Sequence, residues 1–186
     1  TMGIPCIYYG TEQAFDGAGG SDRYLREAMF GGEFGAYRSR GRHFFDEDGP
    51  IYRELARILA VRREKIALRR GRQYLCRISG DGQHFGVPRM IGDRMRSIVP
   101  WTRLFDDQEI LVAVNTDPDG EREAWVEVKR GILQFSNRLR CIYASDEGQV
   151  GQVLPIEERA TADGVAQVVL LRVPAAGVVI YEGEAG

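Results

Sequence analysis

The segment GIPCIYYGTE, residues 3–12, opens the chain with apolar side chains at almost every position. In an extended strand, Ile4 and Cys6 lie on one face, and Ile7 and Tyr9 lie on the other. A strand that is apolar on both faces is typical of a parallel sheet covered by helices. The sequence shows no parallel partner strand and only one helix after it, so we expect the chain to be a piece of a longer protein.

A long polar segment and one helix follow this strand. Residues 11–49 are rich in glycine and show no clear period, and loops of that length are usually functional. From Pro50 onward, apolar residues recur at helical spacing, with Ile51, Leu55 and Ile58 as the first three. The pattern predicts an amphipathic helix that ends at Gly71. The basic residues in its second half are expected to form a solvated face.

From residue 72 onward the pattern changes to short β segments separated by turn sequences rich in Gly, Pro and Asp. This change divides the chain into residues 1–71 and residues 72–186. Many short strands with such turns favour an antiparallel β-sandwich or barrel. The predicted strands are Gln73–Ser79, Ser97–Phe105, Glu109–Asn115, Ala124–Val128, Arg138–Ala144, Ala166–Val173 and Val178–Glu182.

The composition excludes several classes of protein. Apolar residues make up 44% of the 186 residues and charged residues 28%, a balance typical of globular domains. A formal charge of −2 argues against a nucleic-acid partner. No apolar run approaches the roughly 20 residues of a membrane helix, so we expect no membrane partner. The cysteines Cys6, Cys76 and Cys141 have no metal-ligand or disulfide spacing, which predicts buried thiols in a reducing, cytoplasmic compartment.

A few polar and aromatic residues could carry function. Glu12 comes directly after the first strand, where it either hydrogen-bonds loop amides or faces a site. Asp22 and Arg26 are four residues apart and could offer an acceptor and a donor to a polyol, or form a surface ion pair. Trp101 and Trp125 could stack on a sugar ring or fill the core of a sandwich.

The two histidines, His43 and His84, precede phenylalanine and have neither metal nor nucleophile spacing. We therefore expect packing or surface roles for them. The sequence also lacks a phosphate-binding loop, a dinucleotide fingerprint and a nucleophile elbow. We expect no cofactor and no metal.

Three stretches carry a resemblance to the α-amylase family, glycoside hydrolase family 13. Residues 3–12 resemble its strand-eight signature, Gly-x-Pro-x-x-Tyr-Tyr-Gly-x-Glu. Asp22, Arg26 and the residues Glu27, Met29 and Phe30 are similar to a following motif, in which Ala28 replaces the usual proline and Phe30 the usual tryptophan. Residues 63–71 are similar to the last barrel helix, and residues 110–116 resemble a strand of the β domain called domain C.

The resemblance implies a mainly β chain, with an antiparallel β-sandwich like domain C preceded by a remnant βα unit of a TIM barrel. The family cleaves or transfers α-glucosidic bonds with retention, using two carboxyl groups about 5–5.5 Å apart. These groups, and the Asp of a His-Asp pair, lie before strand eight, so no catalytic residue is expected in this chain. Asp22 and Arg26 match positions that contact sugar hydroxyls, and Glu12 and Tyr9 would line the site beside them.

We therefore expect the C-terminal part of an enzyme that acts on an α-glucan or α-glucoside, with this chain alone inactive. The alternative is a stand-alone carbohydrate-binding β-sandwich module, which needs exposed aromatic residues such as Trp101 or Trp125. A first strand without parallel neighbours leaves backbone groups unpaired. Residues 1–12 are expected to pair with the edge of the β domain, to self-associate with a second copy, or to fray.

Overall fold

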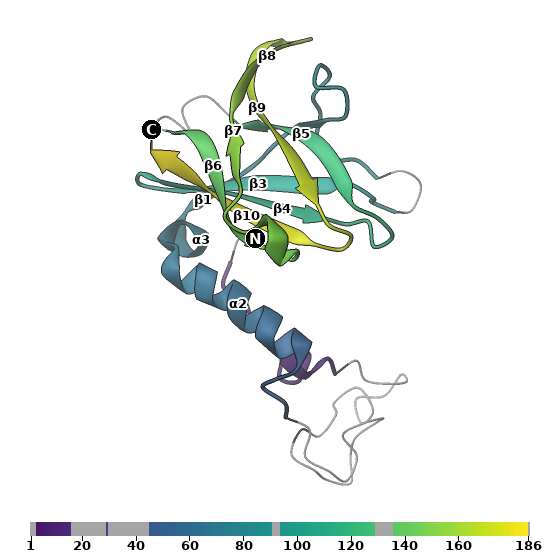
Figure 1. Ribbon diagram of the computed structural model, residues 1–186, viewed down its shortest axis with the longest axis vertical. Helices are drawn as coiled ribbons and strands as arrows, with labels where there is room; N and C mark the ends of the chain where they lie inside the picture. Colours follow the sequence, from purple (N-terminus) through teal and green to yellow (C-terminus); the bar gives the residue numbers. More distant parts are fainter. Residues whose placement is uncertain (1–2, 16–28, 30–44, 91–93, 129–135, 186) are drawn as a thin grey trace. The chain divides into compact units, whose positions relative to one another are not determined.

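The computed structural model describes residues 3–15, 29, 45–90, 94–128 and 136–185. The chain divides into two compact units, which comprise residues 3–60 and residues 61–186. The second unit holds every strand that the structure describes, and it is an antiparallel β-sandwich (Figure 1). The fold class predicted from the sequence is thus confirmed for the β domain. No helix in the described part of the chain is long and apolar enough to cross a membrane.

Two antiparallel sheets form the sandwich. The larger sheet has the strand order β1-β3-β4-β10-β6-β7, and the smaller one has the order β2-β5-β9-β8. The strands of the larger sheet are β1 (Arg72–Leu75), β3 (Ile98–Phe105), β4 (Gln108–Asn115), β10 (Val178–Ala185), β6 (Ser136–Ala144) and β7 (Val153–Pro155). Those of the smaller sheet are β2 (Ile78–Ser79), β5 (Arg122–Val128), β9 (Gly164–Val173) and β8 (Glu157–Thr161).

The hairpin of β3 and β4 shows how a local sequence sets the register of the larger sheet. Phe105 pairs with Gln108, so the connection is a two-residue turn made by Asp106 and Asp107. Asp106 has a φ of 54°, which Asp tolerates better than most residues because its short side chain can hydrogen-bond locally. The register that follows places Trp101 opposite Val112 and puts alternate residues on opposite faces.

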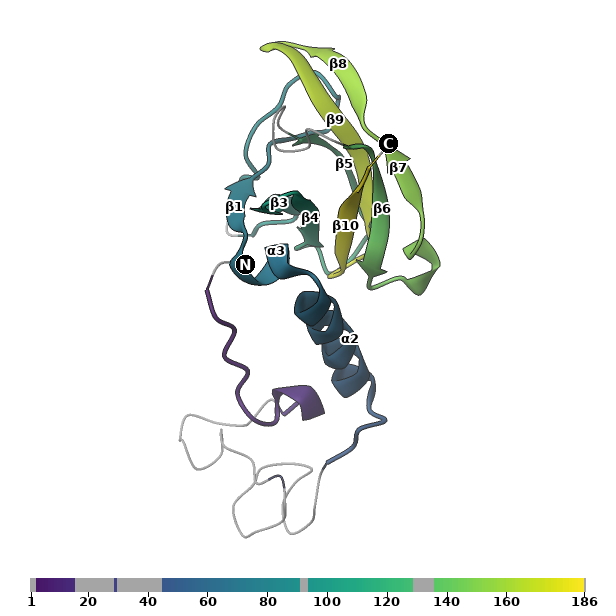
Figure 2. The ribbon, with the colours of Figure 1, turned by 90° about the vertical axis from the view of Figure 1, so that its left-hand side faces the viewer.

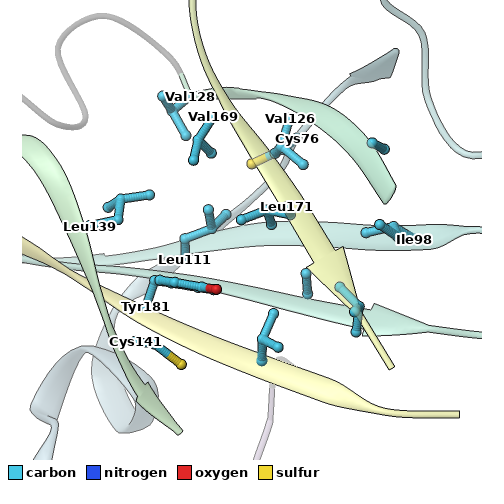
Figure 3. Close-up of a cluster of buried hydrophobic side chains, with 14 of the residues drawn as sticks. Cys76, Ile98, Leu111, Val126, Val128, Leu139, Cys141, Val169, Leu171 and Tyr181 are labelled. Carbon is cyan, nitrogen blue, oxygen red and sulfur yellow. The ribbon is translucent and has the colours of Figure 1, made fainter. Parts of the chain in front are cut away.

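The hydrophobic core lies between the two sheets. Figure 3 shows Leu111 and Tyr181 of the larger sheet beside Val126, Val169 and Leu171 of the smaller one. Each of these side chains is at most 1% exposed. They come from alternate positions of β4, β5, β9 and β10, because a period of two places every second side chain of a strand on the inner face.

A short helix covers part of the outer face of the larger sheet. Helix α3 (Ile66–Arg70) packs on β3 and β4 (Figure 2). Ala67 is fully buried there, and its N–H donates to Gln108 Oε1 at 2.8 Å. Gly71 ends this helix where a Cβ would meet the carbonyl oxygens of Ala67 and Leu104 at 2.5 and 2.8 Å. Only glycine allows so close an approach of the chain to β3.

Glu109 sits at the start of β4, on the same face as Leu111, and burial raises its pKa to about 7. Because the folded-state pKa exceeds that of the unfolded chain, the carboxyl group favours folding most at low pH. This contribution to the free energy of unfolding declines as the pH rises from about 4.5 to about 7.

We expect Glu109→Gln to gain about 1–2 kcal/mol in free energy of unfolding, relative to the wild type, between pH 4.5 and pH 8. Partial contact of the side chain with solvent keeps this below the full value of the shift. Urea unfolding across that pH range measures the gain. Glu121→Gln, at an exposed position, corrects for the loss of one negative charge. A pH-independent difference between Glu109→Gln and the wild type would show that Glu109 does not titrate there.

The first unit contains a short 3-10 helix, η1 (Thr11–Gln13), and helix α2 (Pro50–Glu64), which extends into the second unit. The strand predicted at residues 4–9 is not formed, and this prediction is wrong for the chain on its own. A β-strand exists only where a neighbour accepts and donates its backbone hydrogen bonds. In the described residues no strand pairs with this segment, and Ile4 is 95% exposed.

Candidate functional site

The candidate site is built on the turn that follows residues 3–9. Gly10 has a φ of 86°, and a Cβ at this position would lie 2.3 Å from the Phe15 ring. The N–H groups of Gln13 and Phe15 both donate to the carbonyl oxygen of Gly10, at 3.0 and 2.9 Å. Two features of the turn therefore require glycine at position 10: the positive φ and the close approach of the Phe15 ring.

Tyr9 and Glu12, two of the predicted substrate-binding residues, flank this turn. Tyr9 is 45% exposed, and its ring centroid lies 5.0 Å from that of Tyr8 at an angle of 50°. Glu12 is half-buried on η1. The turn thus holds an aromatic ring and a carboxylate three residues apart. The other two predicted residues, Asp22 and Arg26, lie outside the described residues.

Gln13 is a positioning residue that the sequence did not reveal. Its Oε1 accepts from the N–H of Asp46 at 2.7 Å, and its Nε2 donates to the Asp46 carbonyl oxygen at 3.3 Å. This reciprocal pair joins η1 to the segment that leads into α2, across 33 residues. Only 6% of Gln13 is exposed, so both bonds are sheltered from water. No sequence period marks a single buried glutamine, and no local motif could have found it.

Large apolar side chains remain exposed around this turn. Ile7 is 42% exposed, Tyr8 57% and Ile51, at the start of α2, 48%. No residue of α2 is buried among the described residues, although its spacing is amphipathic. Isolated exposed apolar residues are common, but several exposed together, beside a helix whose apolar face is only partly buried, indicate a surface that can contact another part of a protein.

Two of the residues weighed for carbohydrate contact lie on the sandwich. Trp101 is only 8% exposed and belongs to the packed part of the domain, so it offers no accessible ring. Trp125 is half-buried, and the Arg159 guanidinium carbon lies 3.6 Å from its ring centroid in a cation–π contact. Of these two tryptophans, only Trp125 is accessible enough to support the alternative hypothesis of a stand-alone carbohydrate-binding module.

His84 forms a surface pair with Asp81. Its Nδ1 lies 2.8 Å from Asp81 Oδ2, and the hydrogen bond and charge of that carboxylate raise the histidine pKa. Asp81 also accepts from the N–H groups of His84 and Gln83 and from the Ser79 hydroxyl, and these bonds lower its pKa. The arrangement orders the loop after β2 and forms no nucleophile–base pair, since the Ser79 hydroxyl donates to the carboxylate. His43 lies outside the described residues.

The predicted burial of the thiols is confirmed for two of the three cysteines. Cys76 and Cys141 are buried thiols. Cys6 is exposed, so the prediction is wrong there, because the segment that carries it has no neighbouring strand. In the part of the chain that the structure describes, no group of three or more His, Cys, Asp or Glu side chains could hold a metal ion.

Comparisons with known proteins agree with this architecture. No family model matches the sequence. A curated α-amylase from Streptomyces lividans is 35% identical over 82 residues, which covers 39% of this chain and 9% of that protein. The crystal structure of an α-amylase from Geobacillus thermoleovorans, in complex with acarbose, matches 98% of this chain and 30% of its own, with a TM-score of 0.57 and 19% identity.

A second solved structure extends the likeness. CldA, a cyclomaltodextrin glucanotransferase with a three-domain ABC distribution, matches 98% of this chain with a TM-score of 0.60 and 20% identity. The present chain covers 29% of the CldA chain, so it spans about a third or less of the proteins it resembles. The fold is shared over nearly its whole length, and the closer sequence match is to an α-amylase. On these findings, the chain resembles proteins of the α-amylase family, in sequence over 82 residues and in fold over nearly its whole length.

Proposed function

We propose that this chain is the C-terminal part of an enzyme that hydrolyses or transfers α-glucosidic bonds in an α-glucan or α-glucoside. The observation that carries the proposal is the strand-eight signature at residues 3–12, whose apolar side chains stand uncovered beside the glycine turn of the site. In such an enzyme, residues 1–71 would supply the last strand, loop and helix of a (β/α)8 barrel. Residues 72–186 would form the β domain that follows the barrel.

The exposed apolar surface supports a barrel partner for the first segment. Ile4 and Ile7 would lie against parallel strands on either side, and Ile51 of α2 would pack on the outside of the same barrel. Burial of such side chains stabilises a fold by about 1.5–3 kcal/mol each. Self-association through residues 3–9 is the competing use of this surface, and it predicts a mass that rises with concentration in light scattering.

The chain's own residues would shape the substrate cleft and leave bond cleavage to groups from the rest of the enzyme. The carboxyl ends of barrel strands carry the active site, which is where Tyr9 and Glu12 follow the first segment. Tyr9 would offer its ring to a sugar face, and Glu12 would border the cleft. Asp22 and Arg26 would accept from and donate to sugar hydroxyls. The two carboxyl groups of the retaining reaction would come from outside this chain.

Substitution of Asp22 in the complete enzyme tests this assignment. We expect Asp22→Asn to lower kcat/KM for maltoheptaose by about 10–100-fold, because a charged hydrogen bond to substrate contributes about 1.5–3 kcal/mol. Arg26→Gln should act in the same direction. Asp48→Asn removes an exposed carboxylate that pairs with Arg53, and it should change kcat/KM less than about twofold.

Two results would contradict the proposal. A complete protein without turnover on any α-glucan or α-glucoside would exclude the function. Full activity in both Asp22→Asn and Arg26→Gln would exclude these two residues from the substrate cleft while leaving the reaction itself in place.

A further inference from the structure

The side chain of Gln13 binds both backbone hydrogen-bonding groups of Asp46. Its Oε1 accepts from the Asp46 N–H at 2.7 Å, and its Nε2 donates to the Asp46 carbonyl oxygen at 3.3 Å. A side-chain amide can make this reciprocal pair because it carries an acceptor and a donor on one planar group, as a peptide group does. Gln13 is 6% exposed, so water competes poorly for either bond.

Asp46 belongs to the turn that begins helix α2. Its Oδ1 accepts from the N–H of Asp48 at 2.9 Å, and its carbonyl oxygen also accepts from the N–H of Gly49 at 3.3 Å. The Gly49 carbonyl oxygen accepts from the N–H of Arg53, in α2, at 3.0 Å. Bonds of this kind fix the backbone at the start of a helix. Gln13 thus binds an ordered segment, and Figure 2 shows η1, in purple, beside the first turns of α2.

On its other side, Gln13 is part of the glycine turn of the candidate site. Its backbone N–H donates to the Gly10 carbonyl oxygen at 3.0 Å. Ala14, the next residue, has a φ of 56°, a left-handed conformation that is unfavourable for alanine. Such a residue persists only where neighbouring contacts fix it. The paired amide of Gln13, one residue earlier, is such a contact.

A displacement of Gln13 would move the two residues that flank the turn. Glu12 precedes Gln13 directly, and Tyr9 precedes Gly10, whose carbonyl oxygen binds the Gln13 N–H. Tyr9 is 45% exposed and Glu12 is half-buried, so both can reach a ligand. Gln13 is covered, and its amide is engaged with Asp46. Because a shift of about 1 Å weakens the action of a binding group strongly, Gln13 would affect a ligand through Tyr9 and Glu12.

We propose that Gln13 is a positioning residue for substrate binding, which holds Tyr9 and Glu12 where they contact a glucosyl unit. This inference rests on the proposed function, in which both residues border the cleft. The reacting carboxyl groups come from elsewhere in the enzyme, so Gln13 supports contacts that the ground state and the transition state share. Its loss therefore raises KM and leaves kcat almost unchanged.

Gln13→Glu in the complete enzyme tests this role through its dependence on pH. A protonated carboxyl group has a carbonyl acceptor and an O–H donor and can replace the amide, whereas a carboxylate has no donor and faces the Asp46 carbonyl oxygen. Burial favours the protonated form, so we expect that form at pH 5 and the carboxylate by pH 8. Relative to the wild type at the same pH, KM for maltoheptaose should rise less than about twofold at pH 5 and about 5–20-fold at pH 8, with kcat within about threefold.

Gln13→Met separates the hydrogen bonds of the side chain from its volume. Methionine has a similar length but makes neither bond, so KM should rise about 5–20-fold at both pH values. In an enzyme that already carries Tyr9→Ala and Glu12→Ala, the same substitution should raise KM less than about twofold further, because the residues that Gln13 positions are gone. A merely structural role would give the same rise in both backgrounds and no dependence on pH in Gln13→Glu.

The matched control is Gln83→Glu, at an exposed position, which should keep the wild-type KM at both pH values. Amide hydrogen exchange of the 186-residue chain monitors the pair without any turnover. The N–H of Asp46 should exchange at least about tenfold more slowly in the wild type than in Gln13→Met, because the substitution removes its acceptor.

Three results would overturn the inference, and they differ in what else they exclude. Equal exchange of the Asp46 N–H in the wild type and in Gln13→Met would exclude the pair itself. Turnover by Gln13→Glu with the same KM, relative to the wild type, at pH 5 and pH 8 would exclude the role of Gln13 and leave the proposed function in place. Absence of turnover in the complete wild-type enzyme would exclude the proposed function, and the role of Gln13 with it.

Discussion

Replacement of Asn115 by alanine is expected to lower the free energy of unfolding by about 3 kcal/mol. Asn115 is 1% exposed at the end of β4. Its Nδ2 lies 2.9 Å from the Gly120 oxygen, 3.1 Å from the Val173 oxygen and 2.9 Å from the Pro174 oxygen, and its Oδ1 accepts from the Asp117 N–H at 2.9 Å. One side chain thus ties the β4–β5 connection to the end of β9, and its loss leaves several buried groups unpaired.

Urea unfolding of the purified chain measures this loss. Asn137→Ala, at an exposed position of β6, is the matched control and should lie within about 0.5 kcal/mol of the wild type. Asn115→Asp should destabilise at least as much at neutral pH, because a carboxylate would then face three carbonyl oxygens, and less at low pH. A loss below about 1 kcal/mol in Asn115→Ala would show that water replaces these bonds.

We expect Leu171→Ala to lower the free energy of unfolding by about 3–4 kcal/mol, because the substitution leaves a cavity in the core. Leu171 is fully buried on the inner face of β9, opposite Ala124 of β5 (Figure 3). Val165→Ala, on the same strand but with its side chain 69% exposed, is the control and should cost less than about 0.5 kcal/mol. In both variants the free energy of unfolding should fall with urea concentration at the same slope as in the wild type. Equal effects of the two substitutions would place the core elsewhere than between the sheets.

The strands of the β domain could be predicted because their sequence alternates and their turns carry recognisable residues. Ser97–Phe105 was predicted and Ile98–Phe105 is observed, and Ala166–Val173 corresponds to Gly164–Val173. Where a strand buries one face, the period of two reports the burial directly. Strand β8, Glu157–Thr161, escaped prediction because it is an edge strand with charged residues on both faces.

The helix was predicted as one element and is observed as two. Helix α2 ends at Glu64, and Lys65, whose ψ of 108° is extended, separates it from α3. Lys65 Nζ donates to Glu182 Oε2 at 2.7 Å, a bond to β10 across 117 residues. This hydrogen bond, with the carboxylate charges of Glu182 and Glu64, raises the Lys65 pKa against the opposing effect of burial. The spacing of apolar residues along the helix does not report a contact so distant in sequence, so the break at Lys65 could not be predicted from it.

The candidate site was predicted less completely than the fold. Residues 3–12 carry the resemblance to the α-amylase family. They predicted Tyr9 at the end of a strand and Glu12 directly after it, whereas the structure places both residues at a turn and a short 3-10 helix. The same residues predicted a strand that does not form, because a strand depends on neighbours that the local sequence does not supply. The roles of Asp22 and Arg26 stay predictions, since both lie outside the described residues.

Turnover of maltoheptaose tests the central claim most directly. The assay compares the 186-residue chain alone, the barrel portion that supplies the reacting carboxyl groups, and the two combined. We predict no turnover above the blank for the chain alone and turnover with retention of configuration when both parts are present. Hydrolysis by the chain alone that a Glu12→Gln substitution abolishes would contradict the account, because it would place the catalytic apparatus within these 186 residues.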